Sequence, residues 1–302
     1  MELRGCGTAL VTPFRRDLSV DEEALRALVE WQIGSGIGFL IPCGTTGEAA
    51  TLSEQEWLRV VEVTCEAAAG RVPVFGGCTH NSTYEAVEKV RRLARVKGLT
   101  GILTANPYYN KPGQEGQYQH FKAIAEAVDL PVLLYNIPGR TGANLEPATV
   151  LRLAQIPNII GIKESSGNIV QITELATTAP RDFKILAGDD SMALPVIALG
   201  GVGLVSVASN VVPAEMAAMV RAAMDGDWAT ARSVNQHYFR LMVAHFWEAS
   251  PAPVKAVMQM IGRGEDVLRL PMVPVSDATR KRLEALVTEL GLLRPTAALR
   301  AS

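Results

Sequence analysis

The chain of 302 residues has few cysteines and few histidines, four of each. Its cysteines form no CxxC pair, and free thiols scattered along a chain are typical of a reducing compartment. We therefore expect a cytoplasmic protein in which the thiols at positions 6, 43, 65 and 78 are structural. The histidines show neither HxH nor HxxxH spacing, which argues against a metal site.

An excess of charge of one sign is also absent. The sequence carries 29 Lys+Arg against 31 Asp+Glu, a formal net charge of -2, so neither nucleic acid nor a membrane surface is favoured as a partner. No run reaches the about 20 apolar residues of a membrane helix, and the first residues lack the pattern of a signal peptide. What is present, 48% hydrophobic and 20% charged residues, is typical of a protein with a sizeable core.

Eight short apolar runs recur along the chain, separated by amphipathic segments. They are aliphatic and do not alternate with polar residues, which is typical of parallel strands covered on both faces. The runs occupy residues 7–11, 38–42, 72–76, 101–104, 131–135, 159–163, 184–187 and 203–207. Eight similar strand–helix units favour a (β/α)8 TIM barrel within the α/β class over a doubly wound open sheet.

The pattern changes after the eighth unit. Residues 227–247, 252–261 and 277–290 are helical by periodicity, and no further strand run follows. We therefore predict two domains, a catalytic barrel over residues 1–224 and an α-helical domain over residues 225–302.

Three serine–glutamate pairs predict where helices begin. Ser19 with Glu22, Ser53 with Glu56, and Ser82 with Glu85 each fit the S/T-x-x-E capping box. In this motif the serine oxygen accepts a backbone N–H of the first turn, and the glutamate reaches back to the N–H of the serine.

Barrel enzymes place their reacting groups where the strands end, so the ends of the runs supply the candidate residues. Lys163 closes the sixth run, and a lysine in the mouth of a barrel is desolvated, which favours the neutral amine. A neutral amine attacks a ketone to form a Schiff base, whose protonated form draws electrons from the neighbouring carbon. The alternative is an ordinary strand-end lysine with its ammonium group in water.

Other candidates end neighbouring runs. Tyr135 ends the fifth run, where it would either relay protons or pack at the rim of the barrel. The turn 44–47, Gly-Thr-Thr-Gly, offers N–H groups and hydroxyls to a carboxylate, but it lacks the GK[ST] ending of a phosphate loop. Arg140, in a glycine-rich turn, is a candidate to bind a second carboxylate in a bidentate manner. The alternative is an ordinary arginine whose charge is solvated. The acidic pair 189–190 precedes a helical segment, and we interpret it as a helix cap rather than a cation site.

Several strings at these strand ends, in this order, carry a resemblance. They are GTTGE (44–48), NPYYNKP (106–112), YNIPGRTG (135–142), GIKE (161–164) and GDD (188–190), followed by LRLPMVPVS (268–276). Together they resemble the dihydrodipicolinate synthase family, within the superfamily of pyruvate-dependent class I aldolases. The resemblance covers nearly the whole chain and implies a TIM-barrel lyase without a cofactor or metal.

The resemblance also implies roles for particular residues. Lys163 would form the imine with pyruvate, and Tyr135, Thr46 and Tyr109 would relay protons. Tyr109 would do so in the site of a neighbouring subunit, because the family is typically a homotetramer built as a dimer of dimers. The implied product is the hydroxy-tetrahydrodipicolinate that starts the diaminopimelate route to lysine.

The remaining implied roles concern substrate binding. Thr45 and Thr46 would hold the carboxylate of pyruvate, and Arg140 would hold that of the second substrate, L-aspartate 4-semialdehyde. Gly188 and the backbone of Val205 would line the pocket.

Family members inhibited by lysine bind it near a dimer interface. Asn81, Glu85 and Tyr108 match that set. Ala49, Glu54 and Trp57 instead occupy places where inhibited bacterial enzymes often carry serine and histidines, although Trp57 would still offer a surface for stacking. We therefore expect weak or absent feedback inhibition.

Two alternatives stay open on the sequence. One is a related aldolase, such as an N-acetylneuraminate lyase, a 2-keto-3-deoxy sugar-acid aldolase or a hydroxy-oxoglutarate aldolase, since all share the lysine and the tyrosine. Arg140 and the Thr45–Thr46 pair favour the semialdehyde as substrate over these. The other alternative is a non-catalytic barrel that only binds a keto acid, and such a protein would have no reason to combine the lysine, tyrosine and threonine.

Overall fold

The computed structural model describes residues 3–293. All eight predicted strands are present within it, and they pair in parallel in the order β2-β1-β8-β7-β6-β5-β4-β3. Their bounds are β1 Gly5–Ala9, β2 Phe39–Ile41, β3 Phe75–Gly77, β4 Gly101–Ala105, β5 Val132–Asn136, β6 Ile159–Glu164, β7 Lys184–Ala187 and β8 Gly203–Ser206. The third strand begins later than the run predicted over residues 72–76.

The sheet closes between β2 and β3 through a short seam. Leu40 and Val74 form an isolated parallel bridge. The N–H of Leu40 donates to the carbonyl oxygen of Pro73 (2.9 Å), and the N–H of Gly77 donates to that of Pro42 (2.9 Å). These bonds close the barrel, so the structure confirms the (β/α)8 fold and excludes the open sheet.

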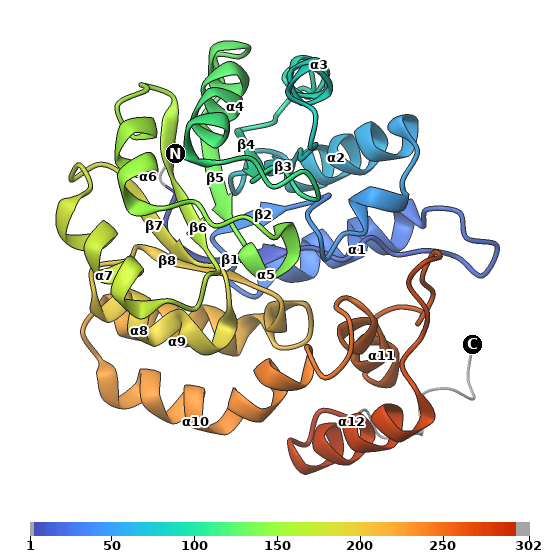
Figure 1. Ribbon diagram of the computed structural model, residues 1–302. Coiled ribbons are helices and arrows are strands. Elements are labelled where there is room, and N and C mark those ends of the chain that lie inside the picture. The colour runs from blue at the N-terminus through green and yellow to red at the C-terminus, as the bar shows by residue number, and fades with distance from the viewer. Residues whose placement is uncertain (1–2, 294–302) are drawn as a thin grey trace.

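Helices surround the barrel, and three further helices lie along one side of it (Figure 1). The surrounding helices are α1 Glu22–Gly34, α2 Glu54–Ala68, α3 Thr83–Leu93, α4 Gln114–Glu126, α5 Pro138–Thr141, α6 Pro147–Leu153, α7 Ile169–Thr178, α8 Ala193–Ala198 and α9 Pro213–Met224. Short 3-10 helices cover Ala49–Thr51 (η1), Asp190–Met192 (η2) and Ala208–Asn210 (η3). None of the helices within residues 3–293 combines the length and the apolar character needed to cross a membrane.

The three C-terminal helices are α10 Trp228–Ala244, α11 Ala252–Met260 and α12 Asp277–Glu289. They match the helices predicted from periodicity, and α10 packs along α9 (Figure 1). The division into two domains after residue 224 stays a prediction, and residues 294–302 of the predicted second domain lie outside the described residues.

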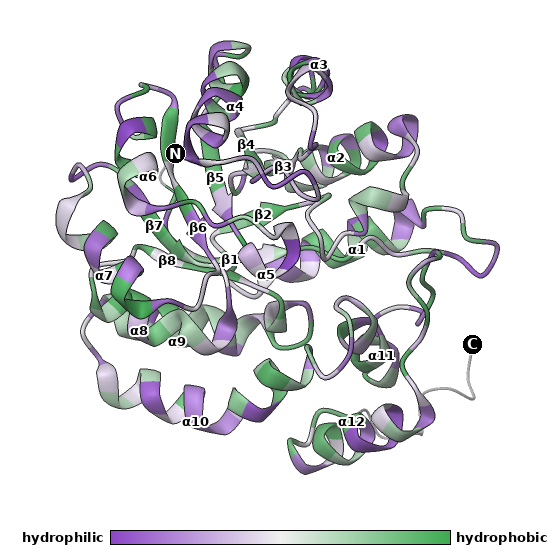
Figure 2. Ribbon diagram, in the orientation of Figure 1, coloured by the Kyte–Doolittle hydropathy of each residue, from purple (hydrophilic) through white to green (hydrophobic). Residues whose placement is uncertain are grey.

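The apolar side chains form two cores. A small inner cluster fills the barrel and includes Phe39, Phe75, Leu133 and Leu186. A much larger cluster lies between the sheet and the helices and continues into α10–α12. In Figure 2 the strands are mostly hydrophobic, whereas the helices alternate hydrophobic and hydrophilic residues, as expected when only one face of each helix is buried.

The predicted helix starts have three different outcomes. Ser53 and Glu56 form the complete capping box at α2. Ser82 caps α3 through the N–H of Glu85, but its own N–H donates to Nδ1 of His80. The predicted Ser19–Glu22 box is wrong. Its serine bonds to Asp17 two residues earlier, and Asp21 caps α1 instead.

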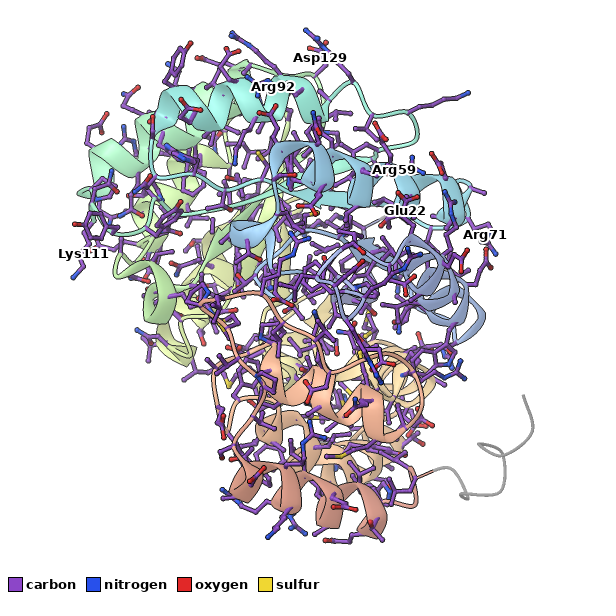
Figure 3. The ribbon with its side chains drawn as sticks, turned by 90° about the vertical axis from the view of Figure 1, so that its right-hand side faces the viewer. Glu22, Arg59, Arg71, Arg92, Lys111 and Asp129 are labelled. Carbon is purple, nitrogen blue, oxygen red and sulfur yellow. The ribbon has the colours of Figure 1, made fainter. Side chains whose placement is uncertain are left out.

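Charged residues join α1 and α2 on the outside. Arg59 of α2 donates to both carboxylate oxygens of Glu22 on α1, at 2.9 and 2.8 Å, and Figure 3 shows the two side chains next to each other. Both are more than a third exposed, so the pair adds little to stability and serves mainly to fix how the two helices meet.

Two histidines are buried without charge compensation. Burial lowers the pKa of His120 to about 4 and that of His245 to about 3. Neither ring nitrogen of His245 has a hydrogen-bond partner among the described residues. In the unfolded chain a histidine binds a proton near pH 6.5, so acid favours unfolding.

We predict that His245→Leu makes the folded protein less sensitive to acid. Between pH 6.5 and about 3, the unfolded state binds a proton at residue 245 that the folded state does not. The free energy of unfolding therefore falls with decreasing pH by up to about 1.4 kcal/mol per unit from this residue alone. Urea unfolding across this range should give a shallower pH dependence for the variant. His237→Leu, which changes an exposed histidine of α10, is the control, and equal slopes for the wild type and His245→Leu would contradict the prediction.

Candidate active site

Lys163 and Tyr135 lie side by side at the carboxyl end of the barrel. They are register partners on β6 and β5, and Nζ of Lys163 lies 4.0 Å from the centroid of the tyrosine ring. Both side chains are buried, with 6% and 7% of their surface exposed. The amine is therefore removed from bulk water and placed against a phenol, as imine chemistry requires.

A β-bulge in β6 sets the direction of Lys163. Val132 of β5 pairs with Ile159, but the next residue, Leu133, pairs with Gly161. The extra residue, Ile160, packs against the inner cluster of the barrel. Such a bulge shifts the alternation of side chains along the rest of the strand.

Beyond the bulge, the alternation favours the lysine. Ile162 belongs to the outer cluster, so Lys163 points into the barrel. Only glycine fits at position 161, since a Cβ there would lie 2.3 Å from the carbonyl oxygen of Lys184 on β7. If the side chains alternated strictly from Ile159 onward, with no bulge, Ile162 would face inward and the amine would face the helices.

Glycine at position 188 leaves room for the lysine side chain. A Cβ on Gly188 would lie 3.1 Å from Cε of Lys163 and 1.9 Å from Oγ of Ser165. Its N–H donates to the carbonyl oxygen of Glu164 (2.8 Å), which holds the end of β7 against β6. Val205 of β8 is fully buried in the inner cluster, so its side chain helps to fill the barrel.

The turn of residues 44–47, which follows β2, is the predicted binding site for a carboxylate, here called the seat. Thr46 is 6% exposed, whereas Thr45 is open to solvent. The N–H of Glu48 donates to the carbonyl oxygen of Thr45 (3.1 Å), and Oγ1 of Thr12 donates to that of Gly47 (2.6 Å). The turn is therefore held at both ends by hydrogen bonds.

Arg140 and Asp189 bring charge to the same end of the barrel. Arg140 lies exposed in the short helix α5, and its guanidinium donates to the carbonyl oxygen of Ser250 (3.4 Å). Burial raises the pKa of Asp189, and the positive charges of Lys163 and Arg140 oppose that shift. The carboxylate of Asp189 thus lies close enough to Lys163 and Arg140 to interact with both.

Comparison with known proteins agrees with this geometry. The model of the Dihydrodipicolinate synthetase family matches residues 2–290. A 4-hydroxy-tetrahydrodipicolinate synthase from Acidobacterium capsulatum is 63% identical over 297 residues, which cover 98% of each chain. The chain belongs to the dihydrodipicolinate synthetase family. It is accordingly a lyase of the class I aldolase type.

Solved structures of dihydrodipicolinate synthases superpose closely on the chain. The chloride-inhibited enzyme from Acinetobacter baumannii, complexed with pyruvate, has a TM-score of 0.94 at 38% identity, with 97% of this chain and 100% of that one covered. The enzyme from Cyanidioschyzon merolae with lysine bound has a TM-score of 0.93 at 39% identity, with coverages of 96% and 99%.

Two buried polar residues next to Lys163 and Tyr135 were not singled out from the sequence. Glu164 is 1% exposed, and its carboxylate accepts hydrogen bonds from Asn136 (3.1 Å) and the N–H of Ser166 (2.6 Å). Burial raises the pKa of Glu164, and these hydrogen bonds oppose the shift. Asn136 and Glu164 follow Tyr135 and Lys163 directly and are themselves register partners, so adjacency in the two strings was the available signal.

The acidic pair after β7 differs from its predicted role. Asp190 does not cap the helix that follows it. Its carboxylate accepts hydrogen bonds from the hydroxyl of Ser206 (2.5 Å) and from the N–H groups of Val207 and Ala208 (both 3.1 Å). Asp190 therefore joins the end of β7 to the loop after β8, a long-range contact that local spacing could not indicate.

Tyr109 is not brought into the same pocket. It is 86% exposed and adopts a left-handed backbone conformation (φ 75°), as does Lys111 (φ 46°). Lys111 projects from the edge of the molecule in Figure 3. The N–H of Tyr109 donates to the carbonyl oxygen of Thr141 (3.4 Å), which ties this loop to α5, the short helix that carries Arg140.

The predicted effector residues are only partly brought together. Nδ2 of Asn110 donates to the carbonyl oxygen of Asn81 (2.9 Å), which places the loop of Tyr108 beside Asn81. Glu85 is exposed on α3, and Ala49 is half-buried in η1. Trp57 is 5% exposed and donates its indole N–H to the carbonyl oxygen of Gly77 (2.9 Å), so it offers little surface to a ligand.

We predict that Gly188→Ala slows imine formation by tenfold or more, equivalent to about 1.4 kcal/mol. The added methyl group would overlap Ser165 and push against Lys163. The measurement is the rate at which borohydride traps the protein with pyruvate, followed by mass spectrometry. Gly34→Ala is the control, because no atom lies within 4 Å of a Cβ at that position in α1. Equal trapping rates for the two variants would show that Gly188 is not needed for space.

Proposed function

We propose that the protein is a 4-hydroxy-tetrahydrodipicolinate synthase, which condenses pyruvate with L-aspartate 4-semialdehyde at the start of the diaminopimelate route to lysine. The observation that carries the proposal is the buried amine of Lys163 beside the ring of Tyr135. The relative from A. capsulatum, named for this activity, supports it, as does the pyruvate complex of the A. baumannii enzyme.

The reaction begins on the keto acid. The amine of Lys163 adds to the carbonyl carbon of pyruvate, and loss of water gives a protonated imine. The positive nitrogen makes the methyl group acidic, so loss of one methyl proton gives an enamine. Tyr135 lies against the lysine and would relay protons in the formation and hydrolysis of the imine, together with Thr46.

The enamine then makes the new bond. Its terminal carbon attacks the aldehyde carbon of the second substrate, whose oxygen takes up a proton. The amino group of the bound adduct attacks the imine carbon, and the ring closes as Lys163 leaves as a free amine. No external oxidant, reductant or metal enters this sequence.

Substrate recognition follows from the charges of the substrates. Both carry carboxylates, and the turn of Thr45 and Thr46 would hold that of pyruvate. Arg140 would hold that of the semialdehyde, because a guanidinium binds carboxylates in a bidentate manner. Gly188 and the backbone of Val205 would line the space between.

We further propose a cytoplasmic homotetramer built as a dimer of dimers. The exposed ring of Tyr109 on a strained backbone supports a contact with a second subunit, whose site it would complete. The four cysteines are free and buried, which agrees with a reducing compartment.

We predict that Arg140→Ala separates the two half-reactions. Borohydride trapping with pyruvate should stay near the wild-type level, whereas kcat/KM for the semialdehyde should fall by roughly 10- to 100-fold, the loss of a charged hydrogen bond of about 1.5–3 kcal/mol. Lys163→Ala is the matched control and should lose both trapping and turnover.

The same assay tests the function as a whole. Pyruvate consumption would be followed with L-aspartate 4-semialdehyde, N-acetylmannosamine, glyceraldehyde and glyoxylate as acceptors. Turnover confined to the semialdehyde supports the synthase. Turnover with another aldehyde alone would keep the lysine chemistry and move the protein to the related aldolases, and unchanged semialdehyde kinetics in Arg140→Ala would refute the role of that residue.

We predict that lysine inhibits the enzyme weakly or not at all. The indole N–H of the buried Trp57 is already bonded to the carbonyl of Gly77, and Ala49 has no polar group in its side chain. Asn81, Glu85 and Tyr108 would therefore bind lysine without help from these two residues. Submillimolar lysine should leave turnover nearly unchanged and give little heat in titration calorimetry, with the C. merolae enzyme as the positive control for binding. Strong inhibition at submillimolar lysine would contradict this prediction.

A further inference from the structure

A buried ion pair links the turn after β2 to the C-terminal helices. Nζ of Lys255, on α11, donates to a carboxylate oxygen of Glu48, the last residue of the GTTGE string. Only 2% and 1% of the two side chains are exposed. The partners are separated by 207 residues, so the pair joins parts of the chain that no local pattern connects.

The segment that follows α11 supplies further hydrogen-bond partners for this pair. Lys255 also donates to the carbonyl oxygen of Val267 (2.9 Å), and the second oxygen of Glu48 accepts the N–H of Arg269 (3.3 Å). Nζ lies 4.2 Å from the centroid of the Phe14 ring. A buried charge pair is tolerated when its other hydrogen bonds are made in this way.

The pair acts on the backbone that closes the turn. The backbone of Glu48 is in the left-handed region (φ 52°), a conformation that is strained for residues other than glycine. Its N–H nevertheless donates to the carbonyl oxygen of Thr45 (3.1 Å), and its own carbonyl oxygen accepts the N–H of Thr51 (3.0 Å). The buried carboxylate therefore holds a strained residue that fixes where Thr45 lies.

Arg269 strengthens the same connection. Its guanidinium donates to the carbonyl oxygens of Leu18 (3.0 Å) and Thr51 (3.0 Å) and to the carboxylate of Glu56 (2.8 Å). Residues 267–269 thus bond to both members of the Glu48–Lys255 pair, to the segment that follows the turn, and to the loop after β1.

We propose that Glu48 and Lys255 are positioning residues that set the geometry of the Thr45–Thr46 seat, so that the C-terminal helices control how well the enzyme binds pyruvate. This inference rests on the proposed role of that seat. Neither residue needs to touch the substrate. Each acts through the backbone of residues 45–48.

A purely structural ion pair would behave differently. Replacing a buried pair by neutral side chains of similar size often leaves stability nearly unchanged, whereas removing one partner strands the other charge. The double variant Glu48→Gln with Lys255→Met removes both charges and should therefore fold. If the pair only stabilises the fold, pyruvate binding should follow the melting temperature. If it positions the seat, pyruvate binding should weaken without a matching loss of stability.

The test measures the pyruvate concentration that gives half-maximal borohydride trapping, a readout that does not involve the second substrate. For the double variant we expect this concentration to rise about tenfold or more, because small displacements of binding groups cost affinity steeply. The melting temperature should stay close to that of the wild type, and the trapped fraction at saturating pyruvate should be complete.

Arg240→Met is the control. It removes the cation from another ion pair of the C-terminal region, in which Arg240 of α10 donates to the carboxylate of Glu289 on α12. Both side chains are exposed, so we expect a melting temperature close to that of the wild type and unchanged half-saturation by pyruvate. The single variant Lys255→Met should show both a lower melting temperature and weaker pyruvate binding.

Thr46→Val separates failure of this inference from failure of the seat itself. If Thr46→Val weakens pyruvate binding but the stable double variant does not, the positioning role is wrong and the seat stands. If neither variant changes half-saturation, the seat is wrongly assigned and the positioning role fails with it. Weaker binding in both variants, with the control unchanged, supports the proposal.

Discussion

The proposed active site depends on a β-bulge in β6. A Schiff-base lysine needs its amine next to the bound keto acid, which in a barrel means that its side chain points inward at the carboxyl end. The β-bulge at Ile160 moves Ile162 to the outer core and turns Lys163 toward Tyr135. The two neighbouring glycines then follow as steric requirements, Gly161 for the backbone of β7 and Gly188 for the methylene groups of the lysine.

Sequence patterns predicted the parts of the molecule that depend on local order. The aliphatic runs located all eight strands, because strands buried on both faces need no polar alternation. The serine–glutamate spacing was right at Ser53, but Ser19 had a nearer partner in Asp17. Strand ends also supplied Lys163 and Tyr135, since parallel strands bring their carboxyl ends to one rim.

Contacts between segments that are distant in the chain could not be predicted from the sequence. The bulge is defined only by pairing with β5, and Asp190 bonds to residues 206–208 rather than to its own helix. Arg140 of α5 bonds to Ser250, just before α11, and Glu48 in the turn after β2 bonds to Lys255 within α11. A short stretch of the C-terminal region thus touches both proposed carboxylate sites, although no motif in the chain marks it.

The barrel should open more easily between β2 and β3 than between its other strands. In the described structure an isolated bridge and a few backbone hydrogen bonds join these strands, whereas every other pair of neighbours is joined in register over two or more residues, with one bulge between β5 and β6. Backbone amides along this seam would therefore lose protection against solvent exchange before those of β5 and β6, which carry the lysine and the tyrosine. In such local opening, the turn that follows β2 would move while Lys163 and Tyr135 stay in place, so fluctuations of the native state would disturb the proposed carboxylate site before the proposed nucleophile.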